Sequence, residues 1–291
     1  MAVANITELS NSVTLGNLLS AEMAPAFVKA AVGLDSVYLE NLPVGTNVKK
    51  FTKAGSLTAA TLAESTALAV DANGELTDSS ISLTAAKCAV SSGLSVEEEQ
   101  FGFISLDRIG QEQGAAIGRF VSDDILSLAG GFSTNTVTCA TVATVDDLML
   151  AQFAIYNAKV PNPEISLNAI LGPRAVYNIK KDIVQSGASV WSNPNMLTLL
   201  SDGKPAANGL MGAIPGICNV YMTTGFGTSG GDDVQMVVHP RWALCGMLAP
   251  APKVWIKQKG SEGAYTEVFS FLFYDVGEWN DAAGCKFSSD T

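Results

Sequence analysis

A long helical pattern in the middle of the chain limits the folds that the chain can adopt. Over residues 105–128, mostly apolar side chains recur at steps of three and four, which is the spacing of one face of an α-helix. This face consists of Leu106, Ile109, Gln113, Ile117, Phe120, Val121, Asp124 and Leu128. A helix of this length spans about 36 Å at about 1.5 Å per residue. Because this length is generous for a compact domain, we expect a strut that supports the elements packed against it.

Three glycines form a line along this predicted helix. Gly110, Gly114 and Gly118 are four residues apart, and each glycine in a helix interior costs roughly 0.8–1 kcal/mol relative to alanine. We therefore expect a smooth groove, where either the sheet beside the helix or the arm of a neighbouring subunit approaches closely. Small residues tolerated on an ordinary face are the alternative interpretation. Before the long helix, residues 95–98 match a capping box and predict a short helical segment ending near Gly102.

The composition indicates a chain whose surface is covered by protein partners. It is 47% hydrophobic and only 15% charged, against roughly 25% charged in typical soluble domains. No apolar run reaches the roughly 18 residues of a membrane span, so we expect partner subunits, and no membrane, to provide the cover. Seventeen basic residues against 28 acidic ones give a net charge of −11. This balance disfavours tight binding of nucleic acid, because phosphate contacts need Lys and Arg.

The residue types that carry chemistry are sparse. A single histidine, His239, nearly excludes cluster-type metal sites, and we expect no cofactor. The cysteines are too widely spaced for a Cys-x-x-Cys motif and fit free thiols in a reducing compartment. They are Cys88, Cys139, Cys218, Cys245 and Cys285.

Residues 44–92 predict a long projection. Residues 46–53 and 81–90 are expected to be strands, and the stretch between them has no aromatic side chain. An Asn73-Gly74 step there suggests a turn at or near the tip. Such a stretch cannot bury enough apolar surface to fold alone, so we expect a two-stranded projection that lies on a neighbouring subunit.

Three lysines cluster at the start of this projection. Lys49, Lys50 and Lys53 all fall within the first predicted strand. They form either a solvated strand face or a patch that docks onto the acidic surface of a neighbour. The pattern favours neither interpretation over the other.

The second half of the chain predicts an α/β region followed by a closing strand. Helices are expected at 145–159 and 173–185, with a strand at 167–171 between them. Further strands are expected from alternating or continuous apolar residues. They cover residues 217–222, 234–238, 253–257 and 265–275. The last of these is the most aromatic, and we expect it to complete a sheet beside the long helix.

A glycine-rich stretch at residues 225–233 matches two catalytic patterns without their structural context. The dinucleotide fingerprint requires a helix to follow, whereas Asp232, Asp233 and another strand follow here. The nucleophile elbow would make Ser229 a hydrolase nucleophile, but His239 follows too soon to fold back as its base. A hairpin turn is the interpretation we favour, and a hydrolase using Ser229 is kept as an alternative. No enzymatic activity is expected.

The order of these parts resembles the HK97-fold major capsid proteins of tailed double-stranded DNA bacteriophages. The resemblance covers nearly the whole chain and rests on low-specificity stretches in a characteristic order. These are VKKFTKAG, AESTALAVDANGELTDSSISLTAAKCAVSSGLSVEEEQF, VSDDILSLAGG, TVDDLMLAQFAIYNAKV and VQMVVHPRWALCGML.

The resemblance implies an α+β fold with four parts. Residues 1–43 correspond to the N-terminal arm and 44–92 to the extended two-stranded loop. Residues 93–145 and 251–291 correspond to the peripheral domain, with its long spine helix and sheet, and 146–250 to the α/β axial domain. Some members of the family carry a Lys–Asn cross-link between subunits, for which one of the three clustered lysines and Asn280 are possible partners.

The function implied by the resemblance is mechanical. Hexamers and pentamers of the chain would tile an icosahedral shell that encloses double-stranded DNA without sequence-specific binding. Such a shell would assemble in the bacterial host cytoplasm and form the capsid of the virion. Separate scaffold, portal and decoration proteins are possible further partners. An encapsulin, a bacterial compartment shell of the same fold that encloses protein cargo, is the alternative.

Overall fold

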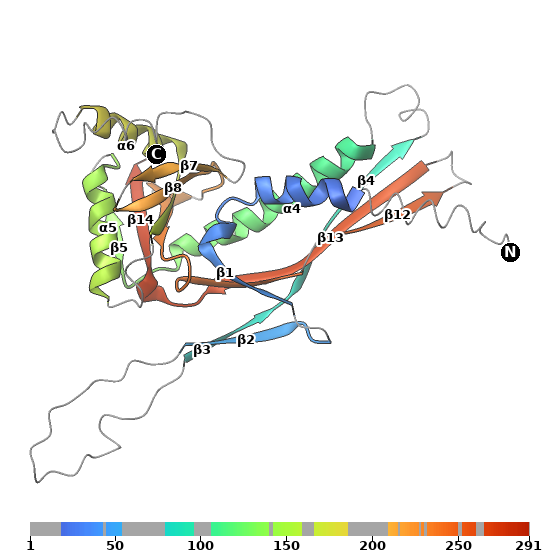
Figure 1. Cartoon of the computed structure of the whole chain (residues 1–291), viewed down its shortest axis with the longest axis horizontal. Helices are drawn as coiled ribbons and strands as arrows, with labels where there is room; N and C mark the ends of the chain where they lie inside the picture. The colour runs from blue at the N-terminus through green and yellow to red at the C-terminus, as the bar shows by residue number, and fades with distance from the viewer. Residues whose placement is uncertain are drawn as a thin grey trace, which may run out of the picture.

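The computed structural model describes most of the chain in twelve stretches. They are residues 19–42, 45–53, 79–95, 106–139, 142–158, 166–185, 209–214, 216–226, 228–229, 232–249, 252–259 and 265–290. The expected turn at Asn73 and Gly74 lies outside these residues, as does most of the short helical segment expected after Ser95. Within them, the chain forms two sheets, a projecting hairpin and a long helix that runs beside the first sheet (Figure 1).

The long helix expected at residues 105–128 is confirmed. Helix α4 spans Leu106–Ser127 and continues as the 3-10 turn η2, Leu128–Gly130. Its predicted apolar face is largely correct, since Ile109, Ile117 and Val121 are buried. The assignment of Phe120 to this face is wrong, because its side chain is 53% exposed. Its ring meets the Tyr274 ring edge-on, with 6.4 Å between the ring centres, and remains half open to solvent.

The first sheet packs against α4 and is built around one long strand. The strands run in the order β1, β11, β13, β12, with β4 also paired to β13. Their bounds are β1 Val37–Asn41, β11 Leu244–Leu248, β13 Tyr265–Glu278, β12 Lys253–Lys259 and β4 Ala86–Ser95. On β13, Val268, Ser270 and Leu272 are buried. Gln113 of α4 donates to the Val268 carbonyl at 3.1 Å, so the expected aromatic strand beside the long helix is confirmed.

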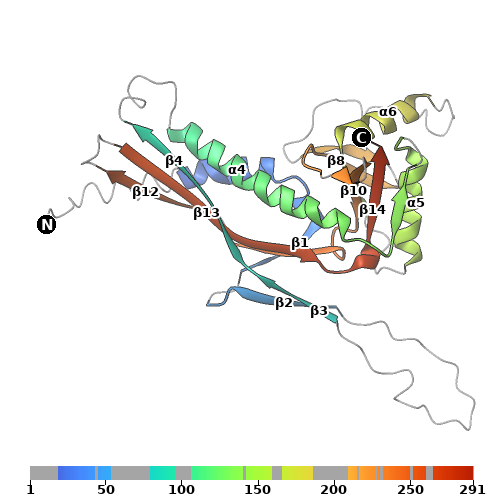
Figure 2. The ribbon, with the colours of Figure 1, turned by 180° about the vertical axis from the view of Figure 1, so that it is seen from behind.

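The second sheet forms a separate layer with two helices (Figure 2). Its order is β5, β14, β10, β6, β8, β7, with β9 paired to β10. The bounds are β5 Thr136–Thr138, β14 Gly284–Asp290, β10 Asp232–Val238, β6 Leu167–Leu171, β8 Cys218–Met222, β7 Leu210–Ile214 and β9 Thr228–Ser229. Every residue of β6 is buried, which fits its mostly apolar sequence; its one polar side chain, Asn168, donates a hydrogen bond to the Ser36 hydroxyl at 3.0 Å.

The two helices of this layer begin where their sequences predict. Helix α5 spans Val145–Asn157, and its Thr144 cap accepts a hydrogen bond from the Asp147 backbone N–H while the Asp147 carboxylate accepts from the Thr144 N–H. Helix α6 spans Pro173–Gln185, starting at the proline whose fixed φ suits the first helical position. None of the helices in the described part of the chain is long and apolar enough to cross a membrane.

Sheet membership departs from the predicted division of the chain. Strand β11 lies in the first sheet although it falls within 146–250, and β5 and β14 lie in the second sheet although they fall within 93–145 and 251–291. Strand β4 falls within the predicted projection, yet it pairs along β13 from Ala86 to Ser95. The reason is that a strand joins a sheet by pairing with strands far away in the sequence. The local sequence pattern of a strand does not show which strands those are.

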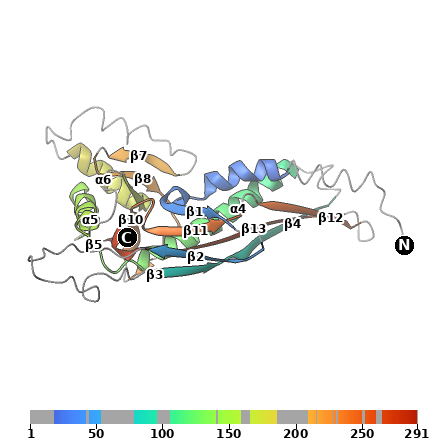
Figure 3. The ribbon, with the colours of Figure 1, turned by 60° about the horizontal axis from the view of Figure 1, so that its bottom comes forward.

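The expected two-stranded projection is confirmed at its base. Strand β2, Val48–Lys53, pairs antiparallel with β3, Ser79–Thr84, and this hairpin stands off one side of the first sheet (Figure 3). Phe51 and Leu83 are buried against Cys245 and Met247 of β11. The base of the hairpin is therefore fixed to its own subunit.

Residues 19–30 form a helix, here called the N-terminal helix. It lies along α4 (Figure 1), and Leu19, Met23 and Phe27 are its buried apolar residues. The 3-10 turn η1, Leu34–Ser36, then leads into β1. The segment expected to be an arm thus supplies both a helix and a strand to the body of the subunit.

Candidate assembly surfaces

The glycine line of α4 receives the N-terminal helix of the same chain. A Cβ added at Gly114 would lie 2.6 Å from the Met23 carbonyl oxygen, and one added at Gly118 would lie 2.6 Å from the Phe27 carbonyl oxygen. At Gly110 the nearest atom would be a methyl carbon of the Leu19 side chain, at 3.0 Å. The structure places this chain's own helix where we expected the sheet or a neighbour's arm.

The lysines at the base of the hairpin are held mostly within the subunit. Lys49 pairs with Glu40 of β1, and its hydrogen bond lowers the pKa of that carboxyl. Lys53 donates to the side-chain oxygen of Asn280. Lys50 is exposed, so it is the lysine of the three that faces solvent most openly. Since the Lys53–Asn280 contact lies within one chain, a cross-link between subunits would need these residues to meet across two copies.

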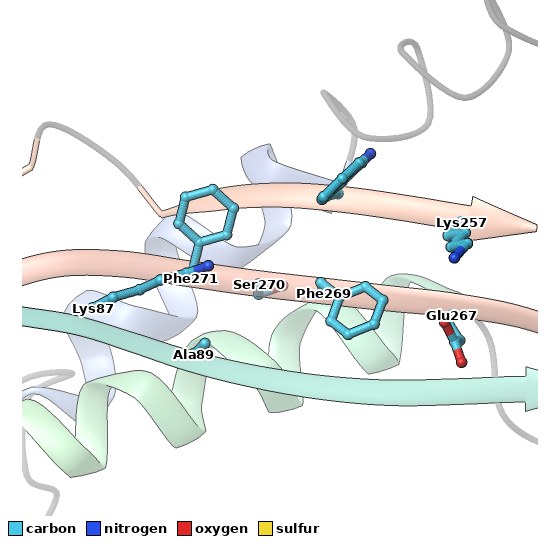
Figure 4. Close-up of a pocket in the computed structure, with 8 residues that line it drawn as sticks. Lys87, Ala89, Lys257, Glu267, Phe269, Ser270 and Phe271 are labelled. Carbon is cyan, nitrogen blue, oxygen red and sulfur yellow. The ribbon is translucent and has the colours of Figure 1, made fainter.

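A groove opens on the face of the first sheet that is turned away from α4 (Figure 4). Its volume is about 270 Å³, and it is lined by Lys87, Ala89, Trp255, Lys257, Glu267, Phe269, Ser270 and Phe271. Trp255 is 69% exposed. The ammonium group of Lys87 lies 4.4 Å from the centre of the Phe271 ring. The groove therefore presents aromatic surface with lysines at its rim.

A second apolar surface lies on α5. Met149, Leu150 and Phe153 are exposed on one side of this helix, and Phe153 is 67% exposed. Tyr177 on the neighbouring helix α6 is also exposed. Large apolar side chains that cluster on a surface mark protein–protein contacts more often than chance. We call Met149, Leu150 and Phe153 the α5 stripe.

The sequence held signals for both surfaces that our interpretation did not use. Phe269, Phe271 and Phe273 alternate along the closing strand, opposite to the buried positions, which indicates a second apolar face. On α5, Met149 and Leu150 directly follow Leu148, so apolar side chains cover a wider part of the helix surface than one buried stripe needs. The approach of Trp255 to Phe269 follows only from strand register.

The geometry does not support Ser229 as a catalytic nucleophile activated by the histidine. Ser229 pairs with Asp232 at one end of β10, and His239 follows the other end, which is about 20 Å away at about 3.4 Å per residue. His239 is fully buried and accepts a hydrogen bond from the Arg241 backbone N–H at 3.3 Å. A nucleophile and its base must lie within hydrogen-bond reach.

The cysteines and the acidic residues provide no reactive or metal-binding centre in the described part of the chain. All five cysteines lie in the described residues, and no disulfide joins any two of them. Burial raises the pKa of the Cys218, Cys245 and Cys285 thiols to about 12, which keeps them protonated and unreactive. Among the described residues, no group of three or more His, Cys, Asp or Glu side chains could hold a metal ion.

The fold is that of capsid proteins of bacteriophages and related particles. The capsid structure of cyanophage P-SCSP1u superposes with a TM-score of 0.63 at 11% identity, over 90% of this chain and 89% of that one. The capsid of a native GTA particle gives 0.66 at 11% identity, over 90% and 91%. A structure of Mycobacterium phage Che8 gives 0.64 at 14% identity, over 88% and 90%.

The expected HK97-like α+β capsid fold is therefore confirmed over nearly the full length of the chain. Sequence comparison alone does not reveal this likeness, since no family model and no curated protein matches the chain.

Proposed function

We propose that the chain is a structural coat protein that assembles with copies of itself into a closed icosahedral capsid. The proposal rests on one observation above the others: the capsid likeness extends over about nine tenths of the chain and of the matched chains. A likeness of that extent concerns the fold of nearly the whole chain and not a single shared motif. The role is mechanical and requires no catalytic residue.

The aromatic groove and the α5 stripe are the surfaces through which copies would meet. They lie on different layers of an elongated molecule, the groove on the first sheet and the stripe beside the second (Figures 2 and 4). A closed shell requires each subunit to contact several neighbours, so separate apolar patches are expected. Exposed Lys50, and Asn73 and Gly74, where the sequence predicts a turn, remain proposed contact positions on the projecting loop.

We keep the division into arm, extended loop, peripheral domain and axial domain as part of this proposal, with its bounds adjusted to the sheets. Strands β4 and β11 join the peripheral part, and β5 and β14 join the axial part. Assembly in a bacterial cytoplasm, the aid of scaffold, portal and decoration proteins, and DNA as the content of the shell also belong to the proposal. An encapsulin-type compartment would differ by enclosing protein cargo.

The direct test is electron microscopy of the purified protein together with an assay of what the particles contain. Closed shells containing double-stranded DNA support the phage role, and shells filled with a protein cargo support the encapsulin alternative. Only small monodisperse particles under every assembly condition would contradict both.

A matched pair of variants tests the α5 stripe. Phe153→Glu should give a folded subunit that fails to form shells, because burying the new charge between copies is costly. Asn157→Glu adds the same charge one turn further along the exposed side of α5 and should assemble normally. Far-UV circular dichroism checks that both variants fold. Shell yields for Phe153→Glu equal to the control would remove the stripe from the interface.

A further inference from the structure

The chain passes between the two sheets at one place. Residues 131–135 lead from α4 to β5, residues 239–243 lead from β10 to β11, and residues 279–283 lead from β13 to β14. Together these three segments are called the joint. The turn of β13 into β14 can be followed in Figure 2. Any change in the angle between the sheets must act on these segments, because they cross between the sheets together.

Hydrogen bonds around the dipeptide Asn280-Asp281 tie the segments of the joint to one another. The Asp281 carboxylate accepts four hydrogen bonds, at 2.5–2.9 Å, from the backbone and hydroxyl groups of Ser133 and Thr134. The Asn280 backbone N–H donates to the Ala243 carbonyl at 3.1 Å. The third segment holds the first mainly through Asp281, and Asn135 adds a hydrogen bond to the Ala282 carbonyl. It holds the second through Asn280, beside backbone hydrogen bonds made by its neighbours Trp279 and Ala283.

The same dipeptide holds the projecting hairpin. Lys53, the last residue of β2, donates to the side-chain oxygen of Asn280. Asn280 is only 7% exposed, so its oxygen depends on this charged donor where water has little access. Beside it, Phe51 of the hairpin meets the Trp279 ring edge-on at 6.4 Å between ring centres. The base of the hairpin thus lies against the joint through consecutive residues.

The aromatic packing at this contact is continuous with the joint. Trp279 stacks on Trp242, which lies in the second segment, with ring centres 5.3 Å apart, and on Tyr38 of β1 at 5.7 Å. The Trp279 indole N–H is buried and has no hydrogen-bond partner among the described residues. Movement of Phe51 would therefore disturb a stack that includes two segments of the joint.

We propose that Lys53 is a latch that couples the position of the projecting hairpin to the arrangement of the joint, and hence to the angle between the two sheets. When Lys53 is bound to Asn280, the dipeptide is held in the orientation that also places Asp281 on Ser133 and Thr134. When the hairpin is pulled away, the buried Asn280 oxygen loses its donor, and the dipeptide loses one of the contacts that fix its orientation. Coupling of this kind acts equally in both directions, so loosening the joint also releases the hairpin.

Hydrogen exchange followed by mass spectrometry on the unassembled full-length subunit tests the latch. Lys53→Met should raise exchange by about tenfold in residues 131–135 of the joint as well as in the hairpin, the effect of losing one charged hydrogen bond. Lys50→Met is the control, because Lys50 is exposed in the same strand and its replacement removes the same charge as Lys53→Met. Faster exchange confined to the hairpin in Lys53→Met would overturn the proposal.

The reverse perturbation gives an independent result. Asp281→Asn weakens the bonds to Ser133 and Thr134, and it should raise exchange by a similar factor in residues 48–53. Thr134→Val, which removes one of the four bonds, is the milder variant if Asp281→Asn fails to fold. Combining either change with Lys53→Met should give less than the product of the separate effects, whereas a full product would show that no coupling exists. These readouts use single subunits, so they do not depend on the proposed capsid role.

Discussion

Replacing Gly114 with alanine should destabilise the subunit, although alanine is the better helix former. Inside a helix the substitution gains about 0.8–1 kcal/mol from propensity alone. The new Cβ, however, would lie 2.6 Å from the Met23 carbonyl oxygen and 3.0 Å from the Met23 Cα, against the 3.4–4 Å of ordinary contact. Both neighbours are backbone atoms, so the N-terminal helix must shift as a unit.

The magnitude follows from two opposing effects. Overpacking of a well-packed core costs about 1–3 kcal/mol, and a shift of the N-terminal helix also loosens the fully buried side chain of Met23. Full burial of such a side chain contributes about 1.5–3 kcal/mol, of which a small displacement loses a part. Subtracting the propensity gain leaves a net destabilisation of about 1–2 kcal/mol. The same reasoning applies to Gly118, where the Phe27 carbonyl oxygen is as close.

Gly110 supplies a control on the same helix. Its added Cβ would meet the end of the Leu19 side chain at 3.0 Å, and the nearest backbone atom is at 3.5 Å. A terminal methyl group moves away by rotation, so the propensity gain should dominate. Gly110→Ala is therefore expected to stabilise the subunit by up to about 1 kcal/mol.

Urea denaturation of the unassembled subunit shows whether each substitution raises or lowers the free energy of unfolding. Gly114→Ala should lower the midpoint and Gly110→Ala should raise it, with the dependence on urea concentration unchanged. If Gly114→Ala raised the midpoint as much as Gly110→Ala, the glycine line would be an ordinary helix surface and the argument from close packing would fail.

Two further predictions concern the start of α5 and the last residue of β13, next to the joint. Thr144→Ala removes the side chain that caps α5 and should lower the free energy of unfolding by about 1 kcal/mol in the same urea assay, whereas an unchanged midpoint would show that the cap is not needed. Burial, and after it the charge of Asp281, raises the pKa of Glu278, so the ionised Glu278 side chain opposes folding at pH 7. Glu278→Gln should therefore be more stable than the wild type at pH 7, and this advantage should vanish as the pH falls below the unfolded-state pKa of about 4.3; an advantage that did not change with pH would contradict the assignment.

The elements that could be predicted from the sequence are those whose determinants are local. The period of α4 and the capping residues Thr144 and Asp147 act within one or two turns, so the pattern is visible without tertiary structure. Phe120 was wrongly assigned to the buried face. A step of three and a step of four differ by one residue, or about 100° around the helix, so this spacing does not define where the buried face ends. Burial at the rim depends on what packs there.

Strands with polar or short sequences could not be predicted in the same way. Strand β14 contains Ser288 and Ser289, which do not look like strand interior, yet both are buried. The Ser289 hydroxyl accepts a hydrogen bond at 2.7 Å from Gln235 of β10, which is buried too. The Ser289 hydroxyl and the Gln235 amide can both be buried because they hydrogen-bond each other. Since the two residues are far apart in the sequence, the pattern around either one does not reveal its partner.

The candidate surfaces were missed for a related reason. Trp255 and Phe269 come together because β12 and β13 pair in one particular register, and a shift of one residue would turn Trp255 to the other face. Sequence shows that both strands are amphipathic, but the register depends on pairings along the whole of β13. A surface built from two strands is therefore less predictable than one built from a single helix such as α5.

The distribution of strands leads us to expect that the two sheets of the subunit unfold together. The first sheet contains β1, which pairs in parallel with β11, and the second sheet contains β14, which lies between β5 and β10. Each sheet thus needs strands from early and late parts of the chain, and the crossings between the sheets are concentrated in the joint. Neither sheet is a contiguous stretch that could fold and move alone, because residues 279–283 join them directly. Motion between the sheets must pass through the joint, and this gives the Asn280-Asp281 dipeptide influence over both sheets and over the hairpin that rests on it.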